Sequence, residues 1–332
     1  MNKFVIILLV VLMILIFSCT KSEKTDQIKI AMCTDVGGVN DQSFNQSAWE
    51  GLQRAEKDFG IKASYLESNQ DADYKPNMET LLDAGNDLIA GIGFKMKDLM
   101  VELSKLNPEQ KYAGIDCWFD SPSENLVGVN FKEQEPSYLV GYIAGKMSKT
   151  GKVGFVGGMD FPVIHKFHYG FLAGVKRADP NCEILVQYAD SFTDAAKGKA
   201  IANQMYKNGA DIIFHAAGAV GDGVIESAKE QNKFAIGVDR DQNHLAPDNV
   251  LTSAMKRVDN AMYNLTKLLV SDEFPGGSNV IYGLKEGGVG IAPTTDKLVP
   301  QEILNEVKTL EGKIISGEII PPASKNEWDA IN

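Results

Sequence analysis

The chain has 332 residues, of which 44% are hydrophobic and 23% charged, so it can build one large or two medium globular domains. Its 33 basic and 44 acidic residues give a net charge of −11 at pH 7. Because contacts to phosphates need clustered Lys and Arg, this charge argues against nucleic-acid binding.

Residues 1–18 have the pattern of a signal peptide. Lys3 precedes fourteen apolar residues, 4–17, a run too short to cross a bilayer comfortably. Ser18 directly before Cys19 resembles the cleavage and lipidation box of bacterial lipoproteins, although Phe17 is bulkier than the usual residue at its place. We therefore expect Cys19 to become a lipid-bearing N-terminus that holds the chain on a membrane, followed by a polar tether up to residue 27. An uncleaved signal anchor is the alternative.

From residue 28 on, segments with the pattern of strands alternate with segments with the pattern of helices. Because repeated strand–helix units form parallel sheets covered by helices on both faces, the sequence predicts an α/β fold. The expected strands are 28–33, 63–66, 88–92, 112–115, 126–129, 153–156, 184–188, 212–214 and 234–238. The expected helices are 42–59, 76–84, 96–105, 163–178, 194–207, 222–230, 258–269 and 300–316.

The chain also repeats itself at an offset of 120–123 residues. Gly114-Ile115-Asp116 recurs as Gly237-Val238-Asp239. Phe44, Gly51, Arg54 and Ala55 recur as Phe167, Gly174, Arg177 and Ala178, and Gly37-Gly38 recurs as Gly157-Gly158. We interpret the repeat as two similar lobes, each with an aspartate at the carboxyl end of a strand. Since open parallel sheets bind ligands at these strand ends, the sequence predicts a hinged cleft lined by Asp116 and Asp239.

Polar and aromatic residues in the loop 35–45 are further candidates for ligand binding. Asn40 and Asp41 offer directional donors and acceptors, and Phe44 lies where the first helix begins. The alternative for this loop is that Asp41 or Ser43 caps the helix and Phe44 packs on the core.

Asp116, Asp239 and Lys256 have structural alternatives as well. A single aspartate after a strand is more often a turn residue or a cap than a ligand contact, but the recurrence in both halves favours binding. Lys256 lies between a strand and the late helix, where an exposed lysine is the usual interpretation and a place in the cleft beside the carboxylates is the other.

Motifs for catalysis and for metal or phosphate binding are weak in this sequence. It contains no nucleophile elbow and no recognisable Ser/His/Asp set. His165 and His168 have the spacing of metal ligands but no third ligand follows, and the glycine-rich turn at 218–223 is not in dinucleotide order. The carboxylates would repel an anion. We therefore expect a neutral, hydroxyl-bearing and partly aromatic ligand, with no metal and no cofactor.

The chain resembles the basic membrane protein family, whose purine-nucleoside receptor lipoproteins are the substrate-binding parts of ABC importers. The resemblance covers residues 29–319. The segments that carry it are NDQSFNQ (40–46), FHYGF (167–171), FTD (192–194), KGK (197–199), AG (217–218), GVD (237–239), and TS (252–253) with Lys256.

The resemblance implies a type I periplasmic-binding-protein fold, in which two doubly wound parallel-sheet lobes are joined by a three-strand hinge. We expect the N-terminal lobe to comprise 28–129 with about 257–283. The C-terminal lobe is expected to comprise 130–256 with about 284–326.

The resemblance also implies roles for individual residues. Asn40 and Asp41 would bond the base of a nucleoside and Phe44 would stack on it. Asp116, Asp239 and Lys256 would bond the ribose, with the backbone of Gly218 close by. A second aromatic wall would come from the other lobe, either Phe214 or its rival Phe167.

The expected function is that of a membrane-tethered receptor, not an enzyme, which captures adenosine, guanosine or inosine and delivers it to an ABC permease. The alternatives are a receptor for a sugar or another small polar ligand, a nucleoside-hydrolysing enzyme, and an adhesin without a cleft ligand.

Overall fold

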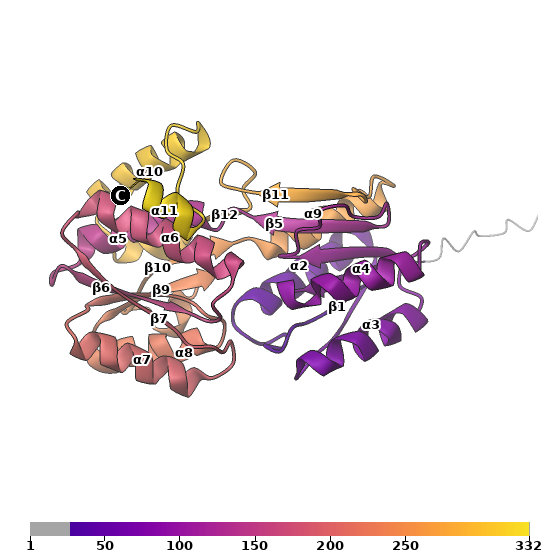
Figure 1. Ribbon diagram of the computed structural model, residues 1–332, viewed down its shortest axis with the longest axis horizontal. Coiled ribbons are helices and arrows are strands. Elements are labelled where there is room, and N and C mark those ends of the chain that lie inside the picture. Colours follow the sequence, from indigo (N-terminus) through magenta and orange to yellow (C-terminus); the bar gives the residue numbers. More distant parts are fainter. Residues whose placement is uncertain (1–26, 332) are drawn as a thin grey trace, which may run out of the picture.

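The computed structural model describes residues 27–331, which form two lobes side by side, each built on a six-stranded sheet (Figure 1). The predicted signal peptide, Cys19 and the tether up to residue 26 lie outside the described residues. Within 27–331, no helix is long and apolar enough to cross a membrane.

The N lobe carries the first sheet. Its strands are β1 (Lys29–Cys33), β2 (Lys62–Leu66), β3 (Leu88–Ile92), β4 (Lys111–Ile115), β5 (Leu126–Phe131) and β11 (Ser278–Tyr282), in the order β11-β5-β4-β3-β1-β2. Helices α2 (Phe44–Phe59) and α9 (Val258–Val270) pack together and contribute to one hydrophobic cluster. Helices α3 (Tyr74–Asp83) and α4 (Lys97–Leu106) contribute to another, so helices cover both faces of the sheet.

The C lobe repeats this plan. Its strands are β6 (Lys152–Gly157), β7 (Glu183–Tyr188), β8 (Ile212–Ala216), β9 (Phe234–Asp239), β10 (Val250–Lys256) and β12 (Val289–Ile291), in the order β12-β10-β9-β8-β6-β7. Helices α5 (Gln134–Met147) and α6 (Pro162–Ala178) pack on one face, and α7 (Ala195–Lys207) and α8 (Val220–Gln231) on the other. Among the described strand pairs, only β10–β12 is antiparallel.

The chain passes between the two sheets three times, after β5, after β10 and after β11. Helix α5 follows an N-lobe strand and packs on α6, while α9 follows a C-lobe strand and packs on α2. Both contacts need glycine, because a Cβ on Gly174 would lie 2.0 Å from the Tyr138 carbonyl oxygen and one on Gly51 would lie 2.3 Å from that of Asp259. These two helices therefore anchor the crossovers after β5 and after β10 to the lobe that the chain enters.

These two similar parallel-sheet lobes confirm the predicted fold class. Every predicted strand and helix is present, with ends within two residues of the expected positions. Five elements lie outside the predicted ranges: α5, β10, β11, β12 and α11 (Lys325–Ile331), which follows α10 (Gln301–Ile315). Ten residues of α5 are buried, so its sequence lacks the polar face by which a helix is recognised.

The remaining features are short turns and the cysteines. Single 3-10 turns occur at Asp71–Asp73, Phe94–Met96, Asn243–Leu245 and Pro293–Lys297. The three cysteines of the described chain, Cys33, Cys117 and Cys182, are buried and free of disulfides.

Candidate ligand-binding cleft

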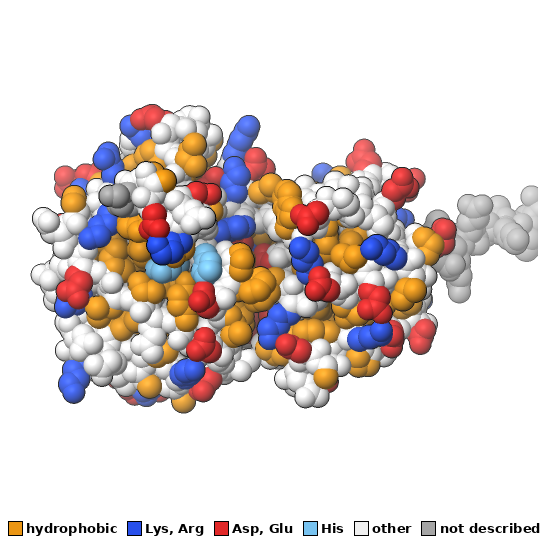
Figure 2. Space-filling view, viewed as in Figure 1, with side chains coloured by type: hydrophobic (Ala, Val, Ile, Leu, Met, Phe, Trp, Pro, Cys, Tyr) orange, Lys and Arg blue, Asp and Glu red, His pale blue; other side chains and the backbone are white. Residues whose placement is uncertain are grey.

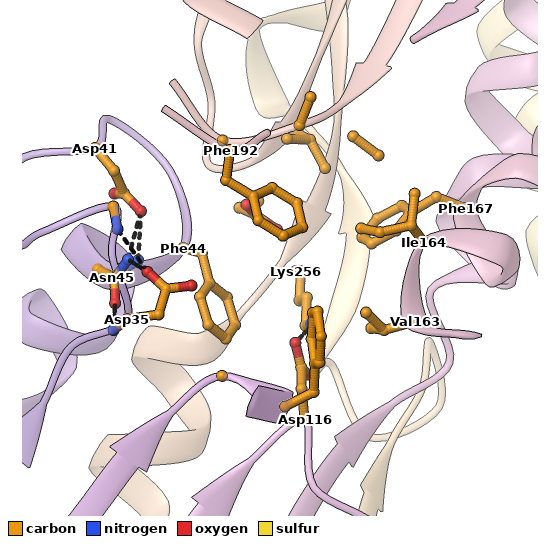
Figure 3. A pocket seen from close by; sticks show the side chains of 18 residues that line it. Asp35, Asp41, Phe44, Asn45, Asp116, Val163, Ile164, Phe167, Phe192 and Lys256 are labelled. Carbon is orange, nitrogen blue, oxygen red and sulfur yellow. Dashed lines mark hydrogen bonds and ion pairs between the residues drawn. The ribbon is translucent and has the colours of Figure 1, made fainter. Parts of the chain in front are cut away.

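A cleft of about 590 Å³, partly open to solvent, lies between the lobes at the carboxyl ends of both sets of strands, and Figure 2 shows the groove between them. Figure 3 shows a polar side from the N lobe and an apolar side from α6. The lining consists of Asp35, Gly37, Asp41, Phe44, Asn45, Gly93, Phe94, Asp116, Val163, Ile164, Phe167, Phe192, Ala216, Ala217, Gly218, Val238, Asp239 and Lys256.

The polar side is organised by the start of α2. The Asp41 carboxylate accepts the backbone N–H groups of Ser43 and Asn45 at 2.9 Å and that of Gln46 at 3.1 Å. Asp41 therefore caps the start of α2 and also lines the cleft. Asn40, next to it, is exposed and lies outside the lining.

Asp35, at the start of the same loop, is a second carboxylate on this side. Its Oδ1 accepts the Asn45 side-chain amide at 2.7 Å and the Gly37 N–H at 2.9 Å. Burial raises the pKa of Asp35 to about 6. The described residues supply no hydrogen bond to its Oδ2, so this oxygen is available to a ligand.

Lys256, the last residue of β10, is the central cation of the cleft and is only 2% exposed. Its Nζ lies 2.6 Å from Asp116 Oδ2 and 2.9 Å from Glu133 Oε1. The second Glu133 oxygen lies 3.0 Å from Lys166 Nζ, which also donates to the Phe131 carbonyl. This chain of four charges joins β4, the first crossover, β10 and α6.

Burial and neighbouring charges shift the pKa values of Lys256 and Glu133 in opposite directions. Burial alone would lower the pKa of Lys256, but the carboxylates of Asp116, Glu133 and Asp239 outweigh it and raise that pKa above its ordinary value. Burial would raise the pKa of Glu133, but Lys166 and Lys256 together hold it below its usual range. Lys256 and Glu133 therefore both stay charged at neutral pH.

Asp116 and Asp239 occupy matching places after β4 and at the end of β9. Both have left-handed backbone, with φ of +63° and +62°, a conformation that costs most side chains about 1 kcal/mol and occurs often at functional sites. Asp116 Oδ1 is buried and has no hydrogen-bond partner in the described chain. Asp239 accepts the Ser43 hydroxyl from the other lobe, and burial raises its pKa to about 7.

The aromatic lining comes from both lobes. Phe44 and Phe167 lie near the Lys256 ammonium, which is 5.0 Å and 5.8 Å from their ring centroids. Phe192 projects from the loop after β7 into the same space (Figure 3). Phe214 instead lies in the C-lobe core, 5.2 Å from Phe171, and does not reach the cleft.

The structure thus brings together seven of the predicted site residues and leaves out two. Those in the lining are Asp41, Phe44, Asp116, Phe167, Gly218, Asp239 and Lys256, whereas Asn40 and Phe214 lie outside it. Sequence reasoning gave no individual role to Asp35, Phe94, Glu133 and Phe192, although Asp35 belongs to the candidate loop 35–45. Asp35 could have been found, because like Asp116 it follows the end of a buried strand.

Comparisons with known proteins identify the family of this chain. Residues 28–325 match the family described as ABC transporter substrate-binding protein, PnrA-like. The chain belongs to the basic membrane protein family. Basic membrane protein A1 of Borrelia garinii is 41% identical over 335 residues, which is 99% of this chain and 98% of that one.

Two further relatives point to the same type of protein. A protein of Lactococcus lactis named ABC transporter nucleoside-binding protein BmpA is 38% identical over 321 residues and 90% of both chains. A solved solute-binding protein of an ABC transporter system from Aeropyrum pernix K1 has a TM-score of 0.84 at 31% identity, covering 92% of this chain and 96% of that one. The chain described here is therefore a substrate-binding protein of the ABC transporter type.

The two histidines with metal-ligand spacing, His165 and His168, each contact a different protein side chain. His165 Nε2 lies 2.5 Å from Asp160 Oδ1, and His168 Nδ1 lies 3.0 Å from the Tyr188 hydroxyl. Across residues 27–331, no group of three or more His, Cys, Asp or Glu could hold a metal ion.

The charge cluster predicts a large effect for Glu133→Gln. The change removes a buried carboxylate between two lysines, so we expect the free energy of unfolding to fall by about 3 kcal/mol or more. Urea denaturation measures this loss. Glu102→Gln is the control, because Glu102 pairs with Lys75 on the surface and is expected to change stability by less than about 1 kcal/mol. Equal losses of unfolding free energy in the two variants would contradict a stabilising role for the buried ion pairs of Glu133.

Proposed function

We propose that this substrate-binding protein captures purine nucleosides, among them adenosine, guanosine and inosine, and delivers them to an ABC permease without chemical change. The observation that carries the proposal is the pairing, in one cleft, of aromatic rings from both lobes with carboxylates gathered around Lys256. Aromatic rings can stack on a flat base, and carboxylates can accept hydrogen bonds from the hydroxyl groups of a ribose. The name of the Lactococcus lactis relative supports the same class of ligand.

In this proposal the base lies between Phe44 and the C-lobe rings of Phe167 and Phe192. Stacking against aromatic faces is worth roughly 1–3 kcal/mol per base and tolerates different purines. Asp35 and Asp41 line the polar side and present carboxylate oxygens to the N–H groups of a base. Asn40 has no part in the proposed contacts, because its side chain lies outside the lining.

The ribose is assigned to the strand ends. Asp116 Oδ1 is buried without a partner in the described chain, and Asp239 projects from the opposite lobe. A carboxylate accepts hydrogen bonds from hydroxyl groups and a protonated carboxyl group can also donate one, so Asp239, whose pKa is raised to about 7, can bond a ribose in either state. Lys256 can donate to a ribose oxygen. Gly218, with φ of +55°, lets the backbone approach closely.

Such a ligand would close the two lobes around itself. It contacts residues of both lobes, and these contacts exist together only when the lobes are closed, so binding shifts the population towards the closed form. Closure is further supported by polar contacts between the lobes, from Arg240 to Glu50 at 2.6 Å and from the Gln242 amide to the Gln42 carbonyl at 3.2 Å.

Thermal unfolding of the chain that begins at Thr20 tests the ligand. A saturating purine nucleoside is expected to raise Tm by about 5 °C, since it binds only the folded state. In Asp239→Asn, whose side chain tolerates the left-handed backbone, the affinity should fall by about 10- to 100-fold. Asp83→Ala, at an exposed position at the end of α3, should keep the wild-type shift.

A rise in Tm with ribose or galactose and none with any nucleoside would contradict the nucleoside and leave the receptor role. Appearance of free purine base during the incubation would contradict transport without chemistry and favour a hydrolase.

We also propose that a lipid on Cys19 anchors the protein at the membrane, facing the periplasm or the exterior. Gln27 donates to the Gly60 carbonyl at 2.9 Å and lies two residues before the first residue of β1, so the chain enters the fold at the amino-terminal edge of the sheet. The cleft lies at the opposite, carboxyl edge. Residues 20–27, extended, span up to about 28 Å, which leaves the cleft free to meet a permease.

Cys19→Ala tests the anchor in the full-length chain. The variant should leave the membrane fraction for the soluble fraction, because one apolar anchor is lost, while its affinity for nucleoside stays unchanged. Fractionation of cells followed by immunoblotting measures the distribution. Retention of Cys19→Ala in the membrane would contradict lipid anchoring and favour an uncleaved signal anchor.

A further inference from the structure

Two phenylalanines meet across the gap between the lobes, in a contact that the proposed ligand contacts do not use. Phe94 belongs to the N lobe, in the 3-10 turn after β3, and Phe161 belongs to the C lobe, at the residue before α6. Their rings are stacked, with centroids 3.9 Å apart and planes 15° apart. Phe192 lies edge-on to Phe94, with centroids 6.3 Å apart. This is an apolar contact between the lobes.

The two rings differ in what they touch. Phe94 lines the ligand cleft and also a small neighbouring pocket, so its ring lies between the two spaces. Phe161 lines neither space and is 40% exposed. Phe161 therefore covers Phe94 from the other lobe without reaching the space for the ligand.

The backbone that carries the rings of Phe94 and Phe161 is restrained in both lobes. Gly93, directly before Phe94, has φ of +122°, and a Cβ there would lie 3.3 Å from Asp35 Oδ2. The carbonyl oxygen of Phe161 accepts the N–H groups of Ile164 and His165, at 2.9 Å and 3.0 Å, which fixes it to the first turn of α6. Because the backbone on both sides is held within its own lobe, opening of the lobes would carry the two rings apart.

We propose that Phe94 and Phe161 form a latch that slows the opening of the closed cleft and thereby sets the rate at which ligand leaves. Opening exposes two apolar faces that are covered when the lobes are closed, and water offers no compensating contact. The Glu50–Arg240 pair, which also joins the lobes, involves side chains 42% and 21% exposed and is screened by solvent. The latch rests on the proposed function for its ligand, but not for its geometry.

The release rate of radiolabelled adenosine or guanosine, chased with unlabelled nucleoside, tests the latch in the chain that begins at Thr20. Phe161→Ala should release ligand about threefold to tenfold faster, the range expected for loss of one stacked pair, with the association rate nearly unchanged. Phe161→Tyr, which keeps the ring, should restore slow release. Tyr65→Ala is the matched control, because Tyr65 is 37% exposed and pairs with Trp49 within the N lobe.

A double-mutant cycle separates a latch from general loosening. Phe94 also lines the cleft, so Phe94→Ala loses ligand contacts of its own, but adding Phe161→Ala to it should cause no further acceleration. Unchanged release from Phe161→Ala, or equal acceleration with and without Phe94, would overturn the latch.

Failure of the latch and failure of the nucleoside claim give different results. If the wild-type protein binds ribose or galactose instead, the same rates measured with that sugar decide the latch while the nucleoside claim is lost. If it binds none of these ligands, both proposals are overturned.

Discussion

The buried ammonium of Lys256 is the charge on which the cleft depends. It is 2% exposed and neutralises Asp116 from the N lobe and Glu133 from the first crossover, with Asp239 of the C lobe close enough to act on its pKa. Burying these groups costs several kcal/mol per ion, and hydrophobic packing of the same volume would stabilise the fold at least as well. We therefore attribute the cluster to the proposed ligand binding rather than to stability.

The position of the charge cluster between the lobes follows from the internal repeat. Because the two sheets have the same strand order and face each other at their carboxyl ends, one repeated strand–aspartate unit places an acidic side chain on each wall. The shared left-handed backbone of Asp116 and Asp239 shows that the repeat extends to the conformation of the site. A ligand held between two such walls is contacted from both lobes, so recognition and closure are the same event. The aromatic rings add contacts of a second kind, within the cleft and across its opening.

Most of the fold could be predicted from the sequence, because amphipathic helices and short apolar strands carry clear periods. Helix α5 could not, since it is buried on nearly all sides, and the three residues of β12 are too few for a pattern. The strand-end aspartates could be predicted from the repeat. Strand periodicity does not say which face meets the cleft, and Phe214 lies in the core. Glu133 gave no signal either, because its partner Lys256 is 123 positions away and burial of a carboxylate cannot be inferred without it.

The central claim is that the charge cluster and the rings together select a purine nucleoside. Mass spectrometry of the small molecules released when the purified protein is denatured tests this most directly, since a closed cleft retains its ligand through purification. We expect an intact purine nucleoside from the wild-type protein, and none from protein carrying Asp239→Asn. A monosaccharide or a free purine base in its place would contradict selection of a purine nucleoside by this cleft.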